Sequence, residues 1–495
     1  MSDAARGMVW LVGAGPGDPG LMTIRGAELL RGADVIVYDR LIGCGVREYF
    51  SRDAKLIDVG KRAGSHLMKQ REIEEVLIRE ASAGKRVVRL KGGDPFLFGR
   101  GGEEALALAG GEIPYEVVPG VSSAIAVPSR AGIPITHRGV SSGVYITTAH
   151  RACGCGGLDY ERLAGLKDTI VLLMSSDEIS DISRRLTEAG MDPDTPAAII
   201  SDGTTARQRE IVTTLRELAL KAGEDEHLSP AVIVVGSAVT LMEDLNRRSP
   251  LPLRGKRIWL TMAERSGGRN RRLVSLLRDA GAEVVPVPCI ETRPRDADLG
   301  SYDLGRFDWF VFSSRAGVEN FFRQMRRSRI DIRAVAGIKI AAVGPATMDA
   351  LEERGIIVDF VPRVNDGEHT AAGIIEMGAK RVLLLRCFGS PCSWKGIFTE
   401  HGTDVEEIGL YETVETSPQV LVNLAPGDIV VFASASAVRA FAKRGDPGVE
   451  GIRAVCIGKP SALAAREAGF EDIMTARGAT DDALFEAIVG NAMPT

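Results

Sequence analysis

Residues 8–41 read MVWLVGAGPGDPGLMTIRGAELLRGADVIVYDRL and contain the pattern that decides the fold. An apolar strand is predicted over Met8–Val12, and the loop after it carries four glycines and two prolines. A helix follows, and a second strand is predicted over Ala33–Tyr38, ending at Asp39. A glycine loop between a strand and a helix lets the backbone approach a nucleotide-like ligand closely. The stretch therefore predicts an α/β cofactor domain.

The loop lacks the features of the two commonest nucleotide-binding loops. A P-loop needs Gly-Lys-Ser or Gly-Lys-Thr at the helix start, and neither is present. A dinucleotide-binding loop has a third glycine at the position of Asp18, where helix and strand must pack closely. The Asp18 carboxylate would also repel a pyrophosphate at the helix N-terminus. These residues favour a cofactor without phosphate groups, and S-adenosylmethionine fits that description.

The composition is that of an ordinary globular protein, with 45% hydrophobic and 26% charged residues in a chain of 495. The formal net charge of −5 argues against nonspecific nucleic-acid binding. No apolar run approaches the roughly 20 residues of a membrane span, and MSDAARGMVW lacks the pattern of a signal peptide. Seven cysteines, an odd total, favour a reducing compartment, so we expect a cytoplasmic protein. Cys153 and Cys155 have no second ligand pair at zinc spacing, so no metal site is predicted.

A charged segment with two prolines divides the chain at residues 246–257, where the periodic pattern is interrupted. We interpret this segment as a linker. It separates a first domain over 8–245, with sub-domains of about 8–118 and 119–245, from a second domain over 258–490.

The second domain contains an internal repeat. GAEVVPVPCIET from Gly281 is echoed by GTDVEEIGLYET from Gly402, and FDWFVFSSRAGVENFF from Phe307 is echoed by GDIVVFASASAVRAFA from Gly427. The copies lie about 120 residues apart, and each alternates short strands with amphipathic helices. We therefore expect two parallel α/β lobes, one from each copy.

Further strands of the first domain end in glycine or small polar residues. The segments are VGKRAG from Val59, VVRLKGGDPFLFGRGGEE from Val87, EVVPGVSSAIAVPSRAGIPITHRG from Glu116, TIVLLMSS from Thr169 and AAIISDGTT from Ala197. One glycine loop alone indicates only a turn. Five such strand ends in one domain indicate a single cofactor cleft formed by many loops.

The first domain resembles the uroporphyrinogen-III C-methyltransferases of the tetrapyrrole methylase family. The resemblance runs from about Val9 to Leu245 and rests on VGAGPGDPG, YDRL, GKRAG, RLKGGDPFLFGRGGEE, VPG and GIPITHR. It implies two α/β sub-domains with a cleft between them, a homodimer, and S-adenosylmethionine as methyl donor. It also implies cofactor contacts for Pro16, Gly92, Gly93, Asp94, Leu97, Ser122, Ser123, Met174 and Gly203.

The resemblance further implies acid–base roles for Asp39 and Lys61. An electron-rich pyrrole carbon attacks a sulfonium methyl group, and the macrocycle then carries positive charge until a proton leaves. Asp39 could stabilise that charge or accept the proton, and Lys61 could bind a substrate carboxylate. His137 is a candidate substrate contact. From the residues alone, a turn-capping Asp39, a solvated Lys61 and a structural His137 stay open as alternatives.

Three positions depart from the family pattern. Ala149 and Ser175 stand where glycine is common, and Ser122 replaces a frequent threonine. A nicotinamide-dependent oxidoreductase is the alternative for this half, and Pro16 and Asp18 in the opening loop argue against it.

The second domain resembles the uroporphyrinogen-III synthases over about Gly255 to Ala487. The resemblance rests on GKRIWLT, GAEVVPVPCIE, FDWFVFSSRAGVENFF, KIAAVGPAT, DFVP and LYETVE. It implies that Tyr411 assists the loss of hydroxide from a linear tetrapyrrole. Met262 and Lys459 depart from the family pattern.

A tetrapyrrole substrate with eight carboxylates requires positive charge and anion contacts. Residues at strand-to-helix junctions are suited to this role, and the candidates are Ser314, Arg315 and Ser434. The resemblance also implies a substrate contact for Ser461, in Lys459-Pro460-Ser461, where the family commonly has a Gly-Pro-Thr-like turn. Helix capping is the alternative for Ser314 and Ser434. A non-catalytic binding or sensor module is the alternative for the whole second half.

Together these features predict an α/β protein, with a two-domain tetrapyrrole methylase fold followed by a two-lobed parallel α/β synthase fold. We expect the second domain to cyclise hydroxymethylbilane to uroporphyrinogen III, and the first to methylate that product twice, giving precorrin-2. Sirohaem and cobalamin both stay open as the end product. No nucleic-acid or membrane partner is expected.

Overall fold

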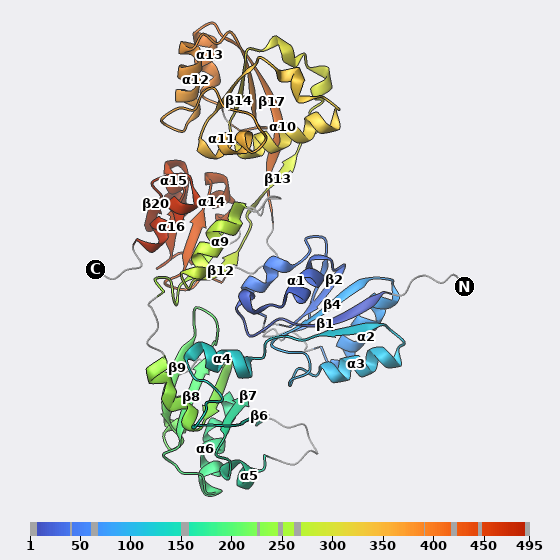
Figure 1. The fold of residues 1–495 in the computed structure, drawn as a ribbon, viewed down its shortest axis with the longest axis vertical. Coiled ribbons are helices and arrows are strands. Elements are labelled where there is room, and N and C mark those ends of the chain that lie inside the picture. The colour runs from blue at the N-terminus through green and yellow to red at the C-terminus, as the bar shows by residue number, and fades with distance from the viewer. Residues whose placement is uncertain are drawn as a thin grey trace. The chain divides into compact units, whose positions relative to one another are not determined.

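The computed structural model describes residues 7–39, 42–60, 68–149, 158–224, 228–245, 251–261, 269–390, 392–416, 423–443 and 448–490. By its internal contacts the chain divides into two units, Met1–Ile258 with Leu276–Pro286, and Trp259–Ser275 with Val287–Thr495. The described residues form four five-stranded sheets with helices packed on them (Figure 1).

The first sheet is parallel and contains the predicted opening strand. Its order is β3-β2-β4-β1-β5, with β1 (Met8–Gly13), β2 (Val35–Tyr38), β3 (Lys55–Asp58), β4 (Arg86–Lys91) and β5 (Tyr115–Val118). One face is covered by α1 (Ile24–Arg31), and the other by α2 (Gln70–Ser82) and α3 (Gly101–Gly110) (Figure 1). Trp10 and Val12 pack on the α1 side, and Val9 and Leu11 pack on the opposite side. Because alternate residues are buried on both faces, β1 reads as a continuous apolar run.

The second sheet is mixed and has the order β6-β7-β10-β8-β9. Its strands are β6 (Val144–Thr148), β7 (Thr169–Leu173), β8 (Pro196–Ser201), β9 (Arg209–Thr214) and β10 (Ala231–Val235). β6 and β7 are parallel, and the other pairs are antiparallel. One face packs against α4 (Ser123–Ala131) and α8 (Met242–Leu245), and the other against α5 (Tyr160–Ala164), α6 (Ile179–Glu188) and α7 (Leu218–Gly223).

Two further sheets are formed by the second half of the sequence. The third has the order β12-β11-β18-β19-β20, with β11 (Arg257–Leu260), β12 (Glu283–Pro286), β18 (Ile429–Phe432), β19 (Arg453–Cys456) and β20 (Asp472–Thr475). The fourth has the order β13-β17-β16-β14-β15, with β13 (Ile290–Pro294), β14 (Trp309–Phe312), β15 (Lys339–Ala342), β16 (Arg381–Cys387) and β17 (Asp404–Glu415). In the fourth sheet β13 is antiparallel to β17, and the remaining pairs are parallel.

The remaining helices alternate with these strands along the chain. They are α9 (Arg269–Asp279), α10 (Arg315–Arg327), α11 (Pro345–Glu352), α12 (Gly367–Glu376), α13 (Lys395–Glu400), α14 (Ala435–Ala442), α15 (Lys459–Glu467) and α16 (Asp481–Val489). Short 3-10 helices are η1 (Pro19–Leu21), η2 (Cys44–Tyr49), η3 (Ser176–Glu178), η4 (Ser237–Leu241), η5 (Leu299–Ser301), η6 (Leu304–Arg306) and η7 (Ile332–Val335).

Each of these two sheets combines strands from both copies of the repeat. The first copy supplies β11 and β12 to the third sheet, but β14 and β15 to the fourth. The second copy supplies β16 and β17 to the fourth sheet, and β18 and β19 to the third. Figure 1 shows the result, because the third sheet and its helices carry both yellow-green and red segments. The prediction of one lobe per copy is therefore wrong. Equivalent strands of similar copies present similar pairing edges, so half of one copy pairs with half of the other.

No described helix combines the length and the apolar character needed to cross a membrane. The described residues also contain no group of three or more His, Cys, Asp or Glu side chains arranged as metal ligands. Cys153 and Cys155 lie outside the described residues.

Candidate functional site

Two glycine loops meet at the carboxyl edge of the first sheet. The loop after β1 and the loop after β4 form an antiparallel bridge between Gly15 and Gly93. The Gly93 N–H donates to the Gly15 carbonyl at 2.8 Å, and the Ala14 N–H donates to the Lys91 carbonyl at 2.7 Å. Gly15 and Gly93 have φ of 76° and 66°, a conformation that strains residues with a Cβ. The two loops contain five of the predicted cofactor residues, which are Pro16, Gly92, Gly93, Asp94 and Leu97.

Gly120 brings a third loop to the same place. A Cβ on Gly120 would lie 2.2 Å from the Gly93 carbonyl oxygen and 2.7 Å from the Gly13 Cα. Asp94 fixes the junction, because its Oδ2 accepts from the Gly120 N–H at 3.0 Å and its Oδ1 accepts from the Phe96 N–H at 2.8 Å. The close approach of three backbones thus requires glycine at 13 and 120. Neither was among the predicted cofactor residues, although the motifs VGAGPG and VPG contain them.

The start of α4 faces the loop that contains Gly93. Ser122 caps the helix by accepting from the Ala124 N–H at 3.2 Å, and Ser123 is the first helical residue. A Cβ at Gly93 would have the Ser122 Cα and the Ser123 nitrogen as its nearest neighbours, both at 3.9 Å. A methyl group at this position would make ordinary van der Waals contact with the start of α4, so Gly93 brings its loop close to that helix.

The loop after β8 of the second sheet contacts both α4 and the opening loop. A Cβ on Gly203 would lie 2.4 Å from Val127 Cγ2 of α4, so the loop after β8 packs directly on that helix. The next residue, Thr204, accepts at its Oγ1 from the Asp18 N–H at 3.2 Å. Met174 follows β7 with a φ of 50° and is 58% exposed. The contact of Thr204 with the opening loop was not predicted.

Two of the departures from the family pattern are hydrogen-bonded to each other. The Ala149 N–H donates to Ser175 Oγ at 3.1 Å, and the Ser175 hydroxyl donates to the Leu173 carbonyl at 2.8 Å. The Ser175 side chain is buried. The serine that stands in place of glycine thus links the ends of β6 and β7.

Asp39 follows β2 at the same edge of the first sheet as the glycine loops. Its Oδ1 accepts from Arg89 Nη2 at 2.7 Å, and its side chain is 30% exposed. The structure therefore places Asp39 as a partly exposed carboxylate held by a guanidinium. Lys61 lies outside the described residues. His137 is exposed in a turn, where its N–H donates to the Ser141 carbonyl at 2.9 Å.

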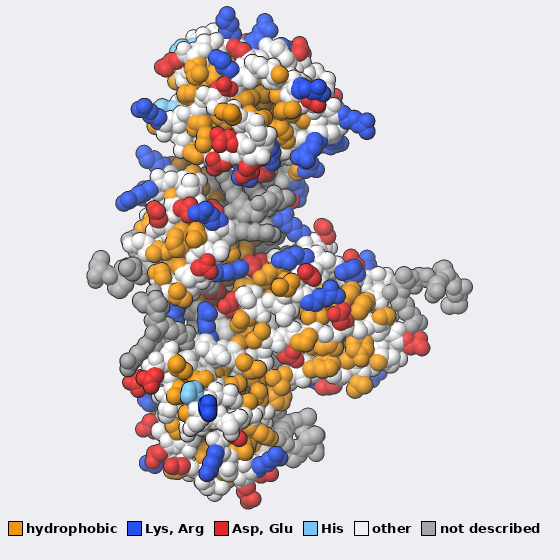
Figure 2. Space-filling model, in the orientation of Figure 1, with side chains coloured by type: hydrophobic (Ala, Val, Ile, Leu, Met, Phe, Trp, Pro, Cys, Tyr) orange, Lys and Arg blue, Asp and Glu red, His pale blue; other side chains and the backbone are white. Residues whose placement is uncertain are grey.

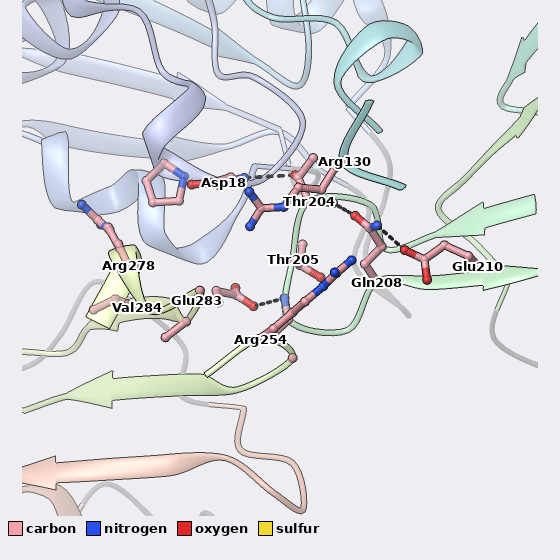
Figure 3. Close-up of a pocket in the computed structure, with 15 residues that line it drawn as sticks. Asp18, Arg130, Thr204, Thr205, Gln208, Glu210, Arg254, Arg278, Glu283 and Val284 are labelled. Carbon is pink, nitrogen blue, oxygen red and sulfur yellow. Dashed lines mark hydrogen bonds between the residues drawn. The ribbon is translucent and has the colours of Figure 1, made fainter. Parts of the chain in front are cut away.

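A cavity of about 160 Å³ lies elsewhere in the first unit (Figure 3). Its charged lining residues are balanced in sign and comprise Asp18, Glu210, Glu283, Arg130, Arg254 and Arg278. Gln208 lies between Thr204 and Glu210 in the lining, accepting from the Thr204 N–H at 2.7 Å and donating to Glu210 Oε1 at 2.6 Å. None of the predicted cofactor residues lines this cavity.

In the second half, the structure joins two predicted residues. Tyr411 lies on β17 with 7% of its surface exposed, and its hydroxyl is 2.8 Å from Ser314 Oγ. Ser314 also caps α10, because its Oγ accepts from the Gly317 N–H at 3.1 Å. The hydroxyl pair thus lies at the carboxyl end of β14, where parallel α/β sheets place their ligand sites.

Two other predicted serines act as helix caps. Ser434 precedes α14 and accepts from the Ala437 N–H at 3.1 Å. Ser461, in the first turn of α15, accepts from the Gly458 N–H at 3.3 Å and donates to the Gly458 carbonyl at 2.8 Å. The contacts of both serines in this structure are those of helix caps, and capping was the alternative for Ser434. Lys459 begins α15, and Met262 lies outside the described residues.

Arg315 is held in ion pairs. Its Nε lies 3.1 Å from Glu319 Oε1, and its Nη2 lies 2.8 Å from Glu353 Oε2. Two carboxylates thus pair with one guanidinium, and a substrate carboxylate would have to compete with both.

Comparison with known proteins identifies a family for each half. Residues 8–219 match the model of the Tetrapyrrole (Corrin/Porphyrin) Methylases. Residues 271–486 match the model of Uroporphyrinogen-III synthase HemD.

Two individual relatives match a stretch of the chain that includes residues of both halves. The Porphyrin biosynthesis protein HemD of Ruminiclostridium josui is 40% identical over 501 residues, covering 98% of this chain and 99% of that protein. The Uroporphyrinogen-III C-methyltransferase of Bacillus subtilis (strain 168) is 40% identical over 359 residues, covering 72% of this chain and 73% of that protein. Among solved structures, the uroporphyrin-III C-methyl transferase from Thermus thermophilus complexed with S-adenyl homocysteine is 39% identical. The match covers 48% of this chain and 100% of that one, with a TM-score of 0.42.

Proposed function

The chain belongs to the family in which a tetrapyrrole methylase is fused to a uroporphyrinogen-III synthase, and we propose that its halves catalyse consecutive reactions. It is a bifunctional enzyme of porphyrin biosynthesis, with a methyltransferase domain followed by a synthase domain. The synthase converts hydroxymethylbilane into uroporphyrinogen III with inversion of ring D. The methyltransferase adds two methyl groups to that product, giving precorrin-2. Fusion of the two domains supports this sequence, because the product of one is the substrate of the other.

The contact between the glycine loops, beside Asp39, is the observation that carries the methyltransferase proposal. S-adenosylmethionine supplies an electrophilic methyl group, which an electron-rich pyrrole carbon attacks. We assign its binding to the predicted set Pro16, Gly92, Gly93, Asp94, Leu97, Ser122, Ser123, Met174 and Gly203. The close approach of the Gly93 loop to the start of α4, at the carboxyl edge of the first sheet, supports this assignment. The Asp94 carboxylate holds these loops to each other.

Asp39 acts on the substrate side of the reaction in this proposal. After the new carbon–carbon bond forms, the macrocycle carries a positive charge, which a nearby carboxylate stabilises. Asp39 then accepts the proton whose loss restores the neutral ring system. Its partial exposure at the carboxyl edge of the sheet suits contact with a large substrate.

The oxidoreductase alternative is disfavoured by the opening loop. Asp18 caps η1 by accepting at Oδ1 from the Gly20 N–H at 2.8 Å. The opening loop therefore carries a carboxylate where a dinucleotide-binding loop has its third glycine. Titration with a nicotinamide dinucleotide distinguishes the two, since saturable binding would favour the oxidoreductase.

In the synthase, Tyr411 assists the departure of hydroxide from hydroxymethylbilane by donating a proton from its hydroxyl group. Its bond to Ser314 fixes the direction of that hydroxyl. Replacing Tyr411 with phenylalanine is expected to lower kcat for uroporphyrinogen III formation about tenfold to a hundredfold, because a general acid is lost. The rate is measured by separating the type III and type I isomers. Tyr302→Phe, in the same half, is the control and should keep the full rate. Unchanged turnover in Tyr411→Phe would favour the sensor-module alternative.

One incubation tests both halves. Purified protein is mixed with hydroxymethylbilane and S-adenosylmethionine, and the products are resolved by isomer and by number of methyl groups. We expect dimethylated type III product, and unmethylated type III product when the cofactor is omitted. Type I product alone would reject synthase activity, whereas unmethylated type III despite added cofactor would reject the methyltransferase.

We also propose that the protein is a homodimer through its first half, as the family resemblance implies. Hydrophobic side chains gather at the surface over α3 (Figure 2). Leu106 of α3 is 75% exposed, and Phe96 in the preceding loop is 58% exposed. Light scattering should give twice the chain mass of 52.9 kDa, and Leu106→Glu should shift the protein toward the monomer. A monomeric wild-type protein would reject the proposal.

A cytoplasmic location completes this proposal. All five described cysteines, Cys44, Cys289, Cys387, Cys392 and Cys456, are free thiols. Free thiols are typical of proteins in a reducing compartment.

A further inference from the structure

Two cationic residues are buried inside the first sheet. Arg89 and Lys91 lie on β4, two positions apart, and are only 2% and 3% exposed. The period of a strand places both on one face, the face that α2 and α3 cover. Burial lowers the pKa of the Lys91 ammonium, so this environment disfavours charge. Such a placement is unusual in a strand with neighbours on both sides, and it calls for compensating partners.

Glu104 is the common partner of the two cations. It lies in the first turn of α3 and is fully buried. Its Oε1 accepts from Arg89 Nε at 3.0 Å and from Lys91 Nζ at 2.9 Å, and Gln70 Nε2 donates to it at 3.3 Å. Its Oε2 has no hydrogen-bond partner among the described residues. One carboxylate oxygen thus fixes two side chains of β4.

Each of the three guanidinium nitrogens of Arg89 has a hydrogen-bond partner. While Nε bonds Glu104, Nη1 lies within reach of the carbonyls of Val37 and Leu90, and Nη2 donates to Asp39 Oδ1 at 2.7 Å. Of the four charged groups in this network, Asp39 alone has an appreciable exposed fraction, 30%. The buried ion pairs therefore connect to one partly exposed carboxylate, that of Asp39, at the carboxyl edge of the sheet.

We propose that Arg89, oriented by Glu104, is a positioning residue that fixes the Asp39 carboxylate toward the tetrapyrrole during methyl transfer. The inference rests on the role proposed for Asp39. A structural purpose alone accounts poorly for the network, because buried ion pairs contribute little net stability compared with apolar residues of the same volume. The rigid fork of arginine suits a link between two carboxylates, and a lysine at the same position cannot replace it.

A double-mutant cycle on kcat tests the inference. In Arg89→Lys the charge remains, but the side chain cannot bond Asp39 and Glu104 together. We expect kcat for methylation to fall about tenfold to a hundredfold, as misplacement of a reacting group does, with KM for S-adenosylmethionine changed less than about twofold. Glu104→Gln provides a second variant if Arg89→Lys does not fold, and should show the same pattern.

The decisive measurement is the same substitution in an Asp39→Asn background. If Arg89 acts through Asp39, Arg89→Lys causes no further loss there. An equal loss of kcat in both backgrounds, or an unchanged kcat in Arg89→Lys alone, would overturn the inference. Full activity of Asp39→Asn by itself would instead reject the role of Asp39 in the proposed function. Arg86→Lys is the matched control, since Arg86 lies at the other end of β4 and bonds the Gly32 carbonyl. It should leave kcat unchanged in both backgrounds.

Discussion

Replacing Asp39 with asparagine is expected to lower kcat for methylation of uroporphyrinogen III by about a hundredfold or more. The amide keeps the size of the side chain but has no negative charge to stabilise the macrocycle and no basic oxygen to accept its proton. The asparagine still offers Arg89 an oxygen acceptor, so the fall in kcat measures the loss of negative charge and of basicity at position 39. The rate is followed by chromatography of monomethylated and dimethylated products.

Two controls separate this effect from damage to the fold. Asp34→Asn changes a carboxylate at the opposite end of β2, which accepts from the Arg86 N–H at 2.8 Å, and should leave methylation unchanged. Formation of uroporphyrinogen III by the second half should be unchanged in both variants. A wild-type methylation rate in Asp39→Asn would show that Asp39 is not the acid–base group.

Gly120→Ala is expected to destabilise the first domain by about 3 kcal/mol or more and to abolish binding of S-adenosylhomocysteine. The added Cβ would lie 2.2 Å from the Gly93 carbonyl oxygen, a backbone atom that a rotamer change cannot move. Overpacking usually costs about 1–3 kcal/mol, and here it would also push apart the loops of the proposed cofactor site. Gly110→Ala is the control, because its Cβ on α3 would meet nothing within 4 Å. It should stabilise the protein by at most about 1 kcal/mol.

Peptide-resolved hydrogen exchange measures this effect in a chain with several domains, for which a single unfolding transition is not defined. Peptides from β1 and β4 should lose protection in Gly120→Ala, while those from β14 and β16 serve as an internal reference. Calorimetric titration with S-adenosylhomocysteine measures binding. Native protection together with native affinity would contradict the assignment of this junction to the cofactor site.

Local structure in the opening stretch could be predicted closely from the sequence. The strand predicted over Met8–Val12 is observed as Met8–Gly13, and the one predicted over Ala33–Tyr38 is observed as Val35–Tyr38. Both are buried on two faces of a parallel sheet, so their apolar character is continuous and bounded by loop residues. The α/β class follows from the same pattern and is confirmed.

Contacts between distant segments were predicted less well. The hydrogen bond between Asp39 and Arg89 joins residues 50 positions apart. Both residues lie in motifs of the sequence, but the motifs do not predict that the two side chains bond to each other. A signal was present, because Arg89 and Lys91 interrupt an apolar strand at a spacing that places both on one face. The exchange of strands between the repeat copies left no comparable signal, since either pairing satisfies the same apolar patterns.

The exchanged strands set the order in which the second half becomes complete during synthesis. Once Glu415 has left the ribosome, every strand of the fourth sheet exists, whereas the third sheet has only β11 and β12. Two hydrogen-bond acceptors of β11 and the residue after it have not yet been synthesised at that point. The Trp259 indole N–H donates to Asp428 at 2.8 Å, across 169 residues, and the Thr261 hydroxyl donates to the Val431 carbonyl. Until those residues emerge, the apolar edge of β11 is uncovered on a nascent chain. Premature termination before β18 would therefore release a finished fourth sheet attached to an aggregation-prone half sheet.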